Sequence, residues 1–146
     1  MGKLVAIARK TAHRAPMEEL GLVEVTQATG VAGDYRRGVP RKRQVTLLSA
    51  EVWAQVCAEL GAELAWTTRR ANLLVSGVEL PRRAGDRITV GDLALEVCME
   101  TDPCERMDEQ HQGLRAALTP DWRGGVACKV LSDVTIRVGD PVAVEA

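Results

Sequence analysis

Residues 86–100, DRITVGDLALEVCME, have the pattern of a β-hairpin. Apolar and polar residues alternate on both sides of Gly91-Asp92, as they do in strands that bury one face. A two-residue Gly-Asp connection between such segments is typical of a tight hairpin turn. We therefore predict that RITV pairs with LALEVCM in an antiparallel hairpin and that the chain is built mainly from β-structure.

Similar short apolar segments lie on either side of this hairpin, separated by turns rich in Gly, Asp and Pro. We expect GVACKVL (125–131) to pair with VTIRV (134–138) across Ser132-Asp133, and PVAVEA (141–146) to close the chain after Gly139-Asp140. The other segments with strand character are LVAIAR (4–9), LVEVTQA (22–28) and RQVTLLS (43–49).

One segment is clearly helical. Ser49 is a good N-cap and Glu51 lies in the first turn, where the helix dipole favours an anion. Apolar residues then recur every fourth position, at 52, 56, 60 and 64, and Gly61 is placed either to cap the helix or to interrupt it. A second, shorter helix is predicted over EQHQGLRAAL (109–118), weakened by Gly113.

Together these patterns predict a single domain over residues 1–146, mainly β with helices (α+β). We expect a closed or nearly closed β-barrel with one long and one or two short peripheral helices. Strands and helices do not alternate regularly enough for a doubly wound parallel sheet.

Composition excludes several classes of function. The net charge is −1, and the only aromatic residues are three Trp and one Tyr, so we expect no nucleic-acid partner. No apolar run approaches the ~18 residues of a membrane span, and the first apolar run, LVAIA, is too short for a signal peptide. We expect a cytoplasmic protein that does not bind membranes.

The four cysteines do not form a set. None of them shows the two-residue spacing of a zinc ribbon or redox dithiol, and two histidines cannot complete a metal site with them. Cys57 lies on the apolar face of the helix, and Cys98 and Cys128 lie in strands, so these three are predicted to be structural. Cys104 differs because its segment, DPCERMDEQ (102–110), is polar and a proline directly precedes the cysteine.

Two interpretations of Cys104 remain open from the local sequence: an exposed thiol without a role, or a reactive one. Reactivity requires the thiolate, and the neighbouring carboxylates of Asp102, Glu105 and Asp108 oppose it. Positive charge would have to come from elsewhere in the fold.

Two segments are suited to supply that charge or to bind a phosphate. Arg69 and Arg70 precede Asn72 at the start of a strand, and Arg123 precedes Gly124-Gly125 at the start of another. Solvated arginines and an ordinary turn are the alternative explanation. A third basic segment, GDYRRGVPRKR (33–43), is either a solvated loop or a lid over an anionic ligand.

Seven motifs, in this order, make the chain resemble a MOSC domain, a family named after the C-terminal domain of molybdenum cofactor sulfurases. The resemblance covers about residues 3–144 and is closest to small stand-alone bacterial members. The motifs are VAGDYRRG (31–38), RQVTLLSAEVW (43–53), RRANLLVSGVEL (69–80), GDRITVGDLALEV (85–97), DPCERMDEQHQGL (102–114), WRGG (122–125) and IRVGDPV (136–142).

The resemblance implies a β-barrel-like fold and one functional cysteine, Cys104, which either carries sulfur as a persulfide or ligates the metal of the molybdenum cofactor. It implies that Arg70 and Asn72 belong to the pocket for the pterin and its phosphate. The phosphate-suited pattern of Arg123, Gly124 and Gly125 leads us to add these residues to that pocket.

The chain also departs from larger members of this family. The pyridoxal-phosphate-dependent desulfurase domain of full sulfurases and the additional N-terminal β-barrel of amidoxime-reducing enzymes have no counterpart in the sequence, nor does a ferredoxin-like cysteine set. We therefore expect no pyridoxal phosphate, and a separate cysteine desulfurase or electron-donating reductase as partner.

Two functions remain open. The first is a protein of the molybdenum cofactor, acting as a sulfur transferase or as an oxidoreductase for N-hydroxylated compounds. The second is a non-catalytic β-barrel module that binds an anionic ligand or partner through its arginines.

Overall fold

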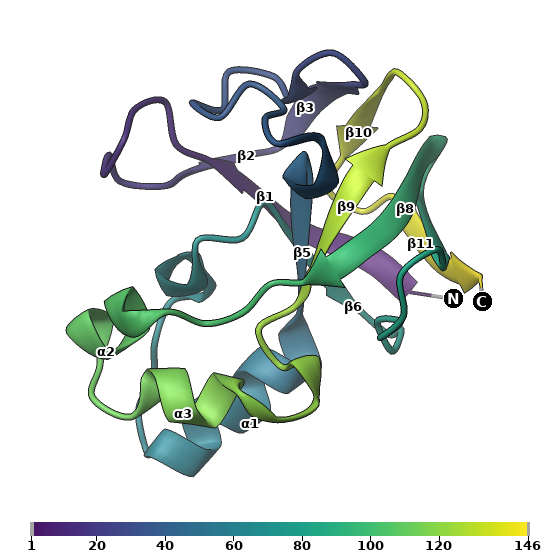
Figure 1. Cartoon of the computed structure of the whole chain (residues 1–146). Helices are drawn as coiled ribbons and strands as arrows, with labels where there is room; N and C mark the ends of the chain where they lie inside the picture. The colour runs from purple at the N-terminus through teal and green to yellow at the C-terminus, as the bar shows by residue number, and fades with distance from the viewer. Residues whose placement is uncertain (1, 146) are drawn as a thin grey trace.

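Seven strands close into a mixed β-barrel (Figure 1). The structure is a computed structural model that describes residues 2–145. Around the barrel the strands follow in the order β11, β7, β8, β9, β5, β6, β1, and the pairing of β1 with β11 closes it. Neighbouring strands are antiparallel except β5 and β6. The bounds are β1 (Gly2–Arg9), β5 (Val45–Ser49), β6 (Leu73–Ser76), β7 (Arg87–Val90), β8 (Leu93–Glu100), β9 (Val126–Val130) and β11 (Pro141–Glu145).

The predicted hairpin is confirmed and shows how the barrel buries its interior. Val90 pairs with Leu93 across Gly91-Asp92. Along β8, residues 93, 95 and 97 are fully buried and alternate with partly exposed residues. The same alternation in the other strands produces one continuous apolar core inside the barrel, including Leu4, Ile7, Leu47, Leu73, Ile88, Leu95 and Val126.

The predicted pairing of the segment 125–131 with 134–138 is wrong. β9 pairs with β5 and β8, whereas β10 (Val134–Arg137) joins a separate three-stranded sheet with β3 (Leu22–Thr26) and β4 (Gly30–Val31). The two connecting side chains explain the change of sheet. The Ser132 hydroxyl accepts from the Ala94 N–H at 2.9 Å, and the Asp133 carboxylate accepts from the Gln27 N–H at 2.8 Å.

The predicted long helix is confirmed as α1 (Ala50–Leu60), but it is shorter than the apolar pattern indicated. Ser49 Oγ accepts from the Val52 N–H at 3.2 Å, and Gly61 ends the helix in the left-handed conformation, φ 64°. Leu64 therefore lies beyond the helix, and its carbonyl accepts a hydrogen bond from Trp53 Nε1 at 2.9 Å.

The predicted helix 109–118 is instead two short helices, α2 (Glu105–Gln110) and α3 (Leu114–Leu118). Gly113 separates them because it adopts a left-handed φ of 88°. Figure 1 shows the three helices together at one end of the barrel and the small sheet at the other. The helices share a second apolar core, which includes Leu48, Trp53, Val56, Met107, Leu114 and Leu118.

The fold is therefore the predicted β-barrel with one long and two short peripheral helices. A short strand, β2 (Glu18–Leu20), extends the sheet beside the far end of β1. Between residues 2 and 145, no helix combines the length and the hydropathy that a membrane crossing requires.

Candidate functional site

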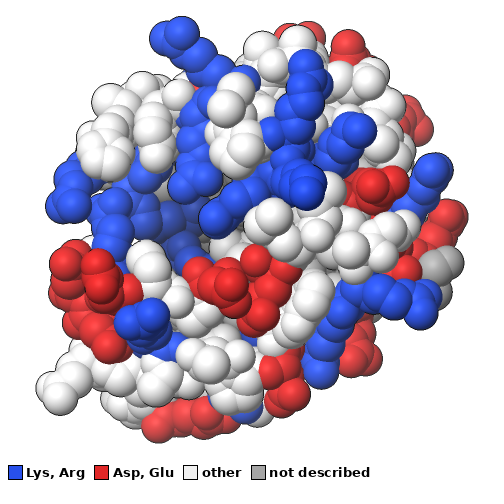
Figure 2. Space-filling model, viewed as in Figure 1, with Lys and Arg blue, Asp and Glu red and all other residues white. Residues whose placement is uncertain are grey.

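A cavity of about 320 Å³ lies where several loops meet beside the helical end of the barrel. Its walls come from the end of β1, the loop at residues 34–36, the start of β5, the segment at residues 69–72 and the segment at residues 101–107. Two carboxylates, Asp34 and Asp102, line it together with six basic side chains: Lys10, Arg36, Arg43, Arg69, Arg70 and Arg106. Figure 2 shows Lys and Arg side chains crowding around a hollow on this face. The cavity therefore favours an anionic ligand.

Cys104 is the only cysteine that lines this cavity. It is exposed and directly precedes α2, and its carbonyl accepts from the N–H of Met107 at 2.9 Å. Since Met107 is buried in the second core, the segment that carries the thiol is anchored while the sulfur stays accessible.

The other three cysteines lie outside the cavity. Cys128 is fully buried inside the barrel, and Cys57 and Cys98 are half-buried, with Cys57 packed against the second core. Burial raises the pKa of the Cys128 and Cys98 thiols above the ordinary value. Ionisation is thus disfavoured at both of these thiols.

The two adjacent arginines have different surroundings because Arg70 adopts a left-handed φ of 67° after the 3₁₀ turn η2 (Trp66–Arg69). Arg69 is buried and donates to the carbonyls of Gly124, at 3.1 Å, and Thr101, at 2.6 Å. Burial lowers its pKa to about 10, against the opposing charges of the Asp102 and Glu100 carboxylates. Arg69 thus ties the segment that leads to Cys104 to the start of β9.

Arg70 instead belongs to a group of polar atoms that lack partners. Within residues 2–145, four buried side-chain nitrogen or oxygen atoms make no hydrogen bond, and all four residues line this cavity: Arg43 Nε, Arg70 Nη2, Thr101 Oγ1 and Arg106 Nε. Buried polar groups in folded proteins are nearly always paired. Their concentration around a single cavity indicates that a ligand with several acceptor oxygens would complete the site.

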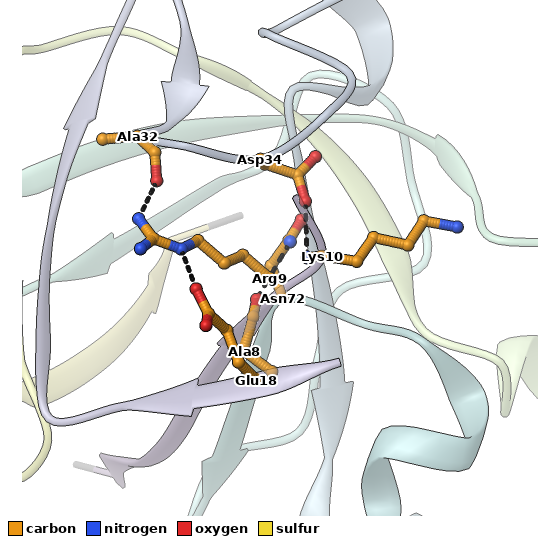
Figure 3. Close-up of polar contacts among 7 residues, drawn as sticks. All are labelled: Ala8, Arg9, Lys10, Glu18, Ala32, Asp34 and Asn72. Atoms are coloured by element: carbon orange, nitrogen blue, oxygen red, sulfur yellow. Dashed lines mark hydrogen bonds and ion pairs between the residues drawn. The ribbon is translucent and has the colours of Figure 1, made fainter. Parts of the chain in front are cut away.

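Asn72 lines the cavity, but its side-chain amide forms hydrogen bonds to other residues of the protein. Its Oδ1 accepts from the N–H and the hydroxyl of Thr46, at 3.1 and 3.2 Å. Its Nδ2 donates to the carbonyl of Ala8 at 3.2 Å (Figure 3). These bonds join the end of β1, the start of β5 and the start of β6. Asn72 therefore stabilises the cavity wall by holding these three strands together.

Arg123 does not reach this cavity. Its guanidinium donates to Glu59 Oε1 on α1 at 2.8 Å and to the Ala117 carbonyl on α3 at 3.1 Å. The hydrogen bond to Glu59 lowers the pKa of that carboxyl group. With Gly125 it lines a different and much smaller cavity of about 50 Å³. We expected Arg123, Gly124 and Gly125 to share one pocket with Arg70, but none of these three residues lines the cavity.

Gly124 and Gly125 are buried and serve close packing. The Gly124 carbonyl accepts from Arg69, and a side chain at residue 124 would meet that guanidinium and the Thr101 carbonyl. Gly125 has a φ of +99°, and a side chain there would collide with the carbonyl of Leu47. Both glycines therefore allow β9 to start close to its neighbours rather than opening the cavity.

Lys10 and Tyr35 complete the cavity wall. The Tyr35 N–H donates to the Lys10 carbonyl at 2.8 Å, and the Lys10 N–H donates to Asp34 Oδ1 at 3.3 Å, so the loop is clamped to the end of β1. Lys10 Nζ lies 4.6 Å from the centre of the Tyr35 ring. Burial, followed by the charges of Arg70 and Arg106, lowers the Lys10 pKa to about 8.

A model of the MOSC domain matches residues 25–143. The chain belongs to the MOSC domain family. Its structure is similar to those of YuaD from Bacillus subtilis (TM-score 0.84, 19% identity, covering 100% of this chain and 97% of that one) and YiiM from Geobacillus stearothermophilus (0.79, 16%, 100% and 76%). YiiM from Escherichia coli is also similar (0.74, 13%, 99% and 70%). At these identities the likeness shows the fold. No curated protein sequence matches the chain.

In this MOSC domain the cavity is lined by Cys104, Arg70 and Asn72, and also by residues that sequence analysis did not select. Lys10 and Thr101 gave no local signal, since each simply follows the last residue of a strand. Arg36 and Arg43 belong to the basic loop for which a lid over an anion was considered, and the structure places both in the cavity wall.

Proposed function

We propose that this MOSC domain binds the molybdenum cofactor in the cavity and uses Cys104 as the sulfur that contacts it. One observation carries the proposal. The only cysteine at the cavity shares it with all four of the unpartnered buried polar atoms found in residues 2–145. A thiol beside unused phosphate-type donors fits a cofactor that has a metal at one end and a phosphate at the other.

The donor set fits the cofactor's charge. Arg43, Arg70 and Arg106 each hold a buried nitrogen without a partner, and guanidinium groups bind phosphate oxygens well. Thr101 adds an unpaired hydroxyl from the segment that also carries Arg106. When bound, the cofactor would supply oxygen-atom transfer chemistry. The protein would supply the anion-binding donors, a rigid wall held by Asn72, and an accessible sulfur ligand.

The exposure of Cys104 supports a role that involves a second protein. In the carrier version, Cys104 holds a persulfide and hands its terminal sulfur to an acceptor after loading by a separate cysteine desulfurase. In the reductase version, the Cys104 thiolate is a metal ligand, and the protein reduces N-hydroxylated compounds with electrons from a separate reductase. A buried thiol such as Cys128 would suit neither version.

The test is the cofactor content of purified protein. The chain is expressed with abundant molybdate, and molybdenum and pterin are measured per chain in the wild type, in Cys104→Ser and in Cys98→Ser. Ligation predicts close to one molybdenum per chain in the wild type and in Cys98→Ser, and its loss in Cys104→Ser. Carriage predicts one added sulfur on the Cys104 peptide after incubation with a desulfurase and cysteine. If neither molybdenum nor an added sulfur is found, the proposal is wrong.

A second candidate function is a non-catalytic module that binds an anion, and the unpartnered guanidinium atoms favour it because they do not depend on the thiol. Under this function Cys104→Ser binds inorganic phosphate or phosphorylated ligands as the wild type does, while Arg70→Met binds them more weakly. Arg123→Ala is the matched control, since Arg123 lies outside the cavity.

A further inference from the structure

The side chain of Lys10 has an unusual position for a lysine. Figure 3 shows it beside Arg9, whose guanidinium donates to Glu18 and to the Ala32 carbonyl, both at 2.6 Å. Lys10 points the other way, into the cavity, and is only 7% exposed. Among residues 2–145, its ammonium has no hydrogen-bond acceptor and no ion-pair partner. The stem of Lys10 is thus buried, whereas its unpaired Nζ keeps contact with the open space of the cavity.

The surrounding charges disfavour the ammonium form. Arg70, Arg106 and Arg36 all line the same cavity and repel a positive charge. The Asp34 carboxylate, whose charge favours the ammonium, accepts from the backbone N–H groups of residues 10 and 36 rather than from the Lys10 ammonium.

Two aromatic side chains line this cavity, and the ring of Tyr35 lies next to the Lys10 ammonium. The Tyr35 ring attracts the ammonium, and the centres of the His13 and Tyr35 rings are 6.0 Å apart. The attraction by Tyr35 is outweighed, because burial and the three arginines lower the Lys10 pKa to about 8. At pH 7.5 about a quarter of Lys10 is therefore an uncharged amine, against about one in a thousand for a lysine of ordinary pKa.

We propose that Lys10 is a nucleophilic amine that condenses with small anionic aldehydes held by the arginines of this cavity. A desolvated lysine beside other cations is the arrangement in which proteins activate an amine for attack on a carbonyl. The arginines serve twice, because they disfavour the ammonium and they attract the phosphate or carboxylate of the substrate. This activity goes beyond the proposed function and involves neither molybdenum nor the sulfur of Cys104.

The reaction is a condensation without oxidation or reduction. The lone pair of Lys10 Nζ attacks the aldehyde carbon, and the carbonyl oxygen takes up a proton. Loss of that oxygen as water leaves a C=N bond between the substrate and Lys10, and water reverses the step. An equilibrium of this kind is trapped when borohydride delivers hydride to the C=N carbon.

The experiment uses glyceraldehyde 3-phosphate with cyanoborohydride at pH 7.5, on protein expressed without added molybdate. Peptide mass spectrometry follows adduct formation at each lysine. The other three lysines, Lys3, Lys42 and Lys129, are exposed and serve as internal controls. The uncharged fraction of Lys10 is roughly 200-fold larger than that of an exposed lysine. The lower nucleophilicity of the weaker base reduces this advantage about tenfold. We therefore expect Lys10 to be labelled at least tenfold faster than the exposed lysines.

Two comparisons test the anionic class of substrate. Unphosphorylated glyceraldehyde should label Lys10 several-fold more slowly than its phosphate, while the exposed lysines react with both at similar rates. In Arg70→Met the phosphate preference should fall and labelling of Lys10 should slow. Circular dichroism checks that Arg70→Met is folded. The comparison of labelling rates among the lysines of the wild type does not depend on this variant.

A rate at Lys10 within twofold of the exposed lysines would overturn the nucleophile. Equal rates with the two aldehydes would overturn the anionic substrate class. Neither result bears on the proposed function, which is tested separately by the molybdenum content of Cys104→Ser.

Discussion

Arg69 and Arg70 are neighbours in sequence, yet the structure predicts opposite effects when each is replaced by methionine. Arg69→Met removes two hydrogen bonds from a charged donor to the carbonyls of Thr101 and Gly124, each worth about 1.5–3 kcal/mol. Relief from burying the guanidinium, whose pKa falls from 12.5 to about 10, offsets up to about 3 kcal/mol. The net loss expected for Arg69→Met is about 2 kcal/mol of unfolding free energy.

Arg70→Met removes no hydrogen bond within residues 2–145, because the buried Nη2 of Arg70 has no partner. Burial and repulsion from Arg106 already lower the pKa of Arg70, so its removal relieves an unfavourable charge. We expect a change within about 0.5 kcal/mol of zero, or a small gain in stability.

Urea unfolding followed by tryptophan fluorescence measures both free energies, and calorimetry should show Arg69→Met melting about 4–8 °C below the wild type. In phosphate binding the order should reverse, with Arg70→Met the weaker binder among the variants that remain folded. Equal destabilisation of the two variants, or a larger loss for Arg70→Met, would refute the division between a structural and a ligand-facing arginine.

Two further predictions follow from the backbone and from the cavity charges. Gly125→Ala should destabilise the protein by more than about 2 kcal/mol, because the added methyl would meet the Leu47 carbonyl at a φ of +99°. Gly61→Ala is the control: Gly61 also has a positive φ but open space around it, so the substitution should cost only about 1 kcal/mol. Equal urea midpoints for the two variants would contradict this prediction. Lys10 binds its proton less tightly in the folded than in the unfolded chain, so its contribution to stability should rise as pH increases from about 8 towards 10.5. Lys10→Met should therefore be more stable than the wild type at pH 7 and should lose that advantage at pH 10, and a pH-independent difference in urea midpoints would exclude the lowered pKa.

Local chemistry explains which features could be predicted from the sequence. The hairpin at residues 86–100 depends on alternation and a two-residue turn, and the start of α1 depends on the Ser49 cap, so both are encoded within a few residues. The unusual character of Cys104 was likewise visible from its polar neighbours, and the structure places it at the cavity.

Long-range contacts explain what could not be predicted. Ser132 and Asp133 looked like an ordinary turn, but their side chains bond to residues 94 and 27 and send β10 to another sheet. Arg123 had a phosphate-suited sequence, but Glu59, far away in the chain, holds it against α1. Lys10 entered the site only because the loop carrying Tyr35 folds back onto β1.

The Cys104 sulfur lies at a cavity lined by cations, and its rates with two alkylating reagents of different charge measure the effect of those cations. Anionic iodoacetate and neutral iodoacetamide have similar size, so the ratio of their rates reports the charge that each thiol faces. Relative to N-acetylcysteine, we predict a ratio at Cys104 raised roughly tenfold at low salt, and lowered again in Arg70→Met or by high salt. A ratio at Cys104 equal to that of N-acetylcysteine and insensitive to salt would mean that the cavity cations do not act on this sulfur.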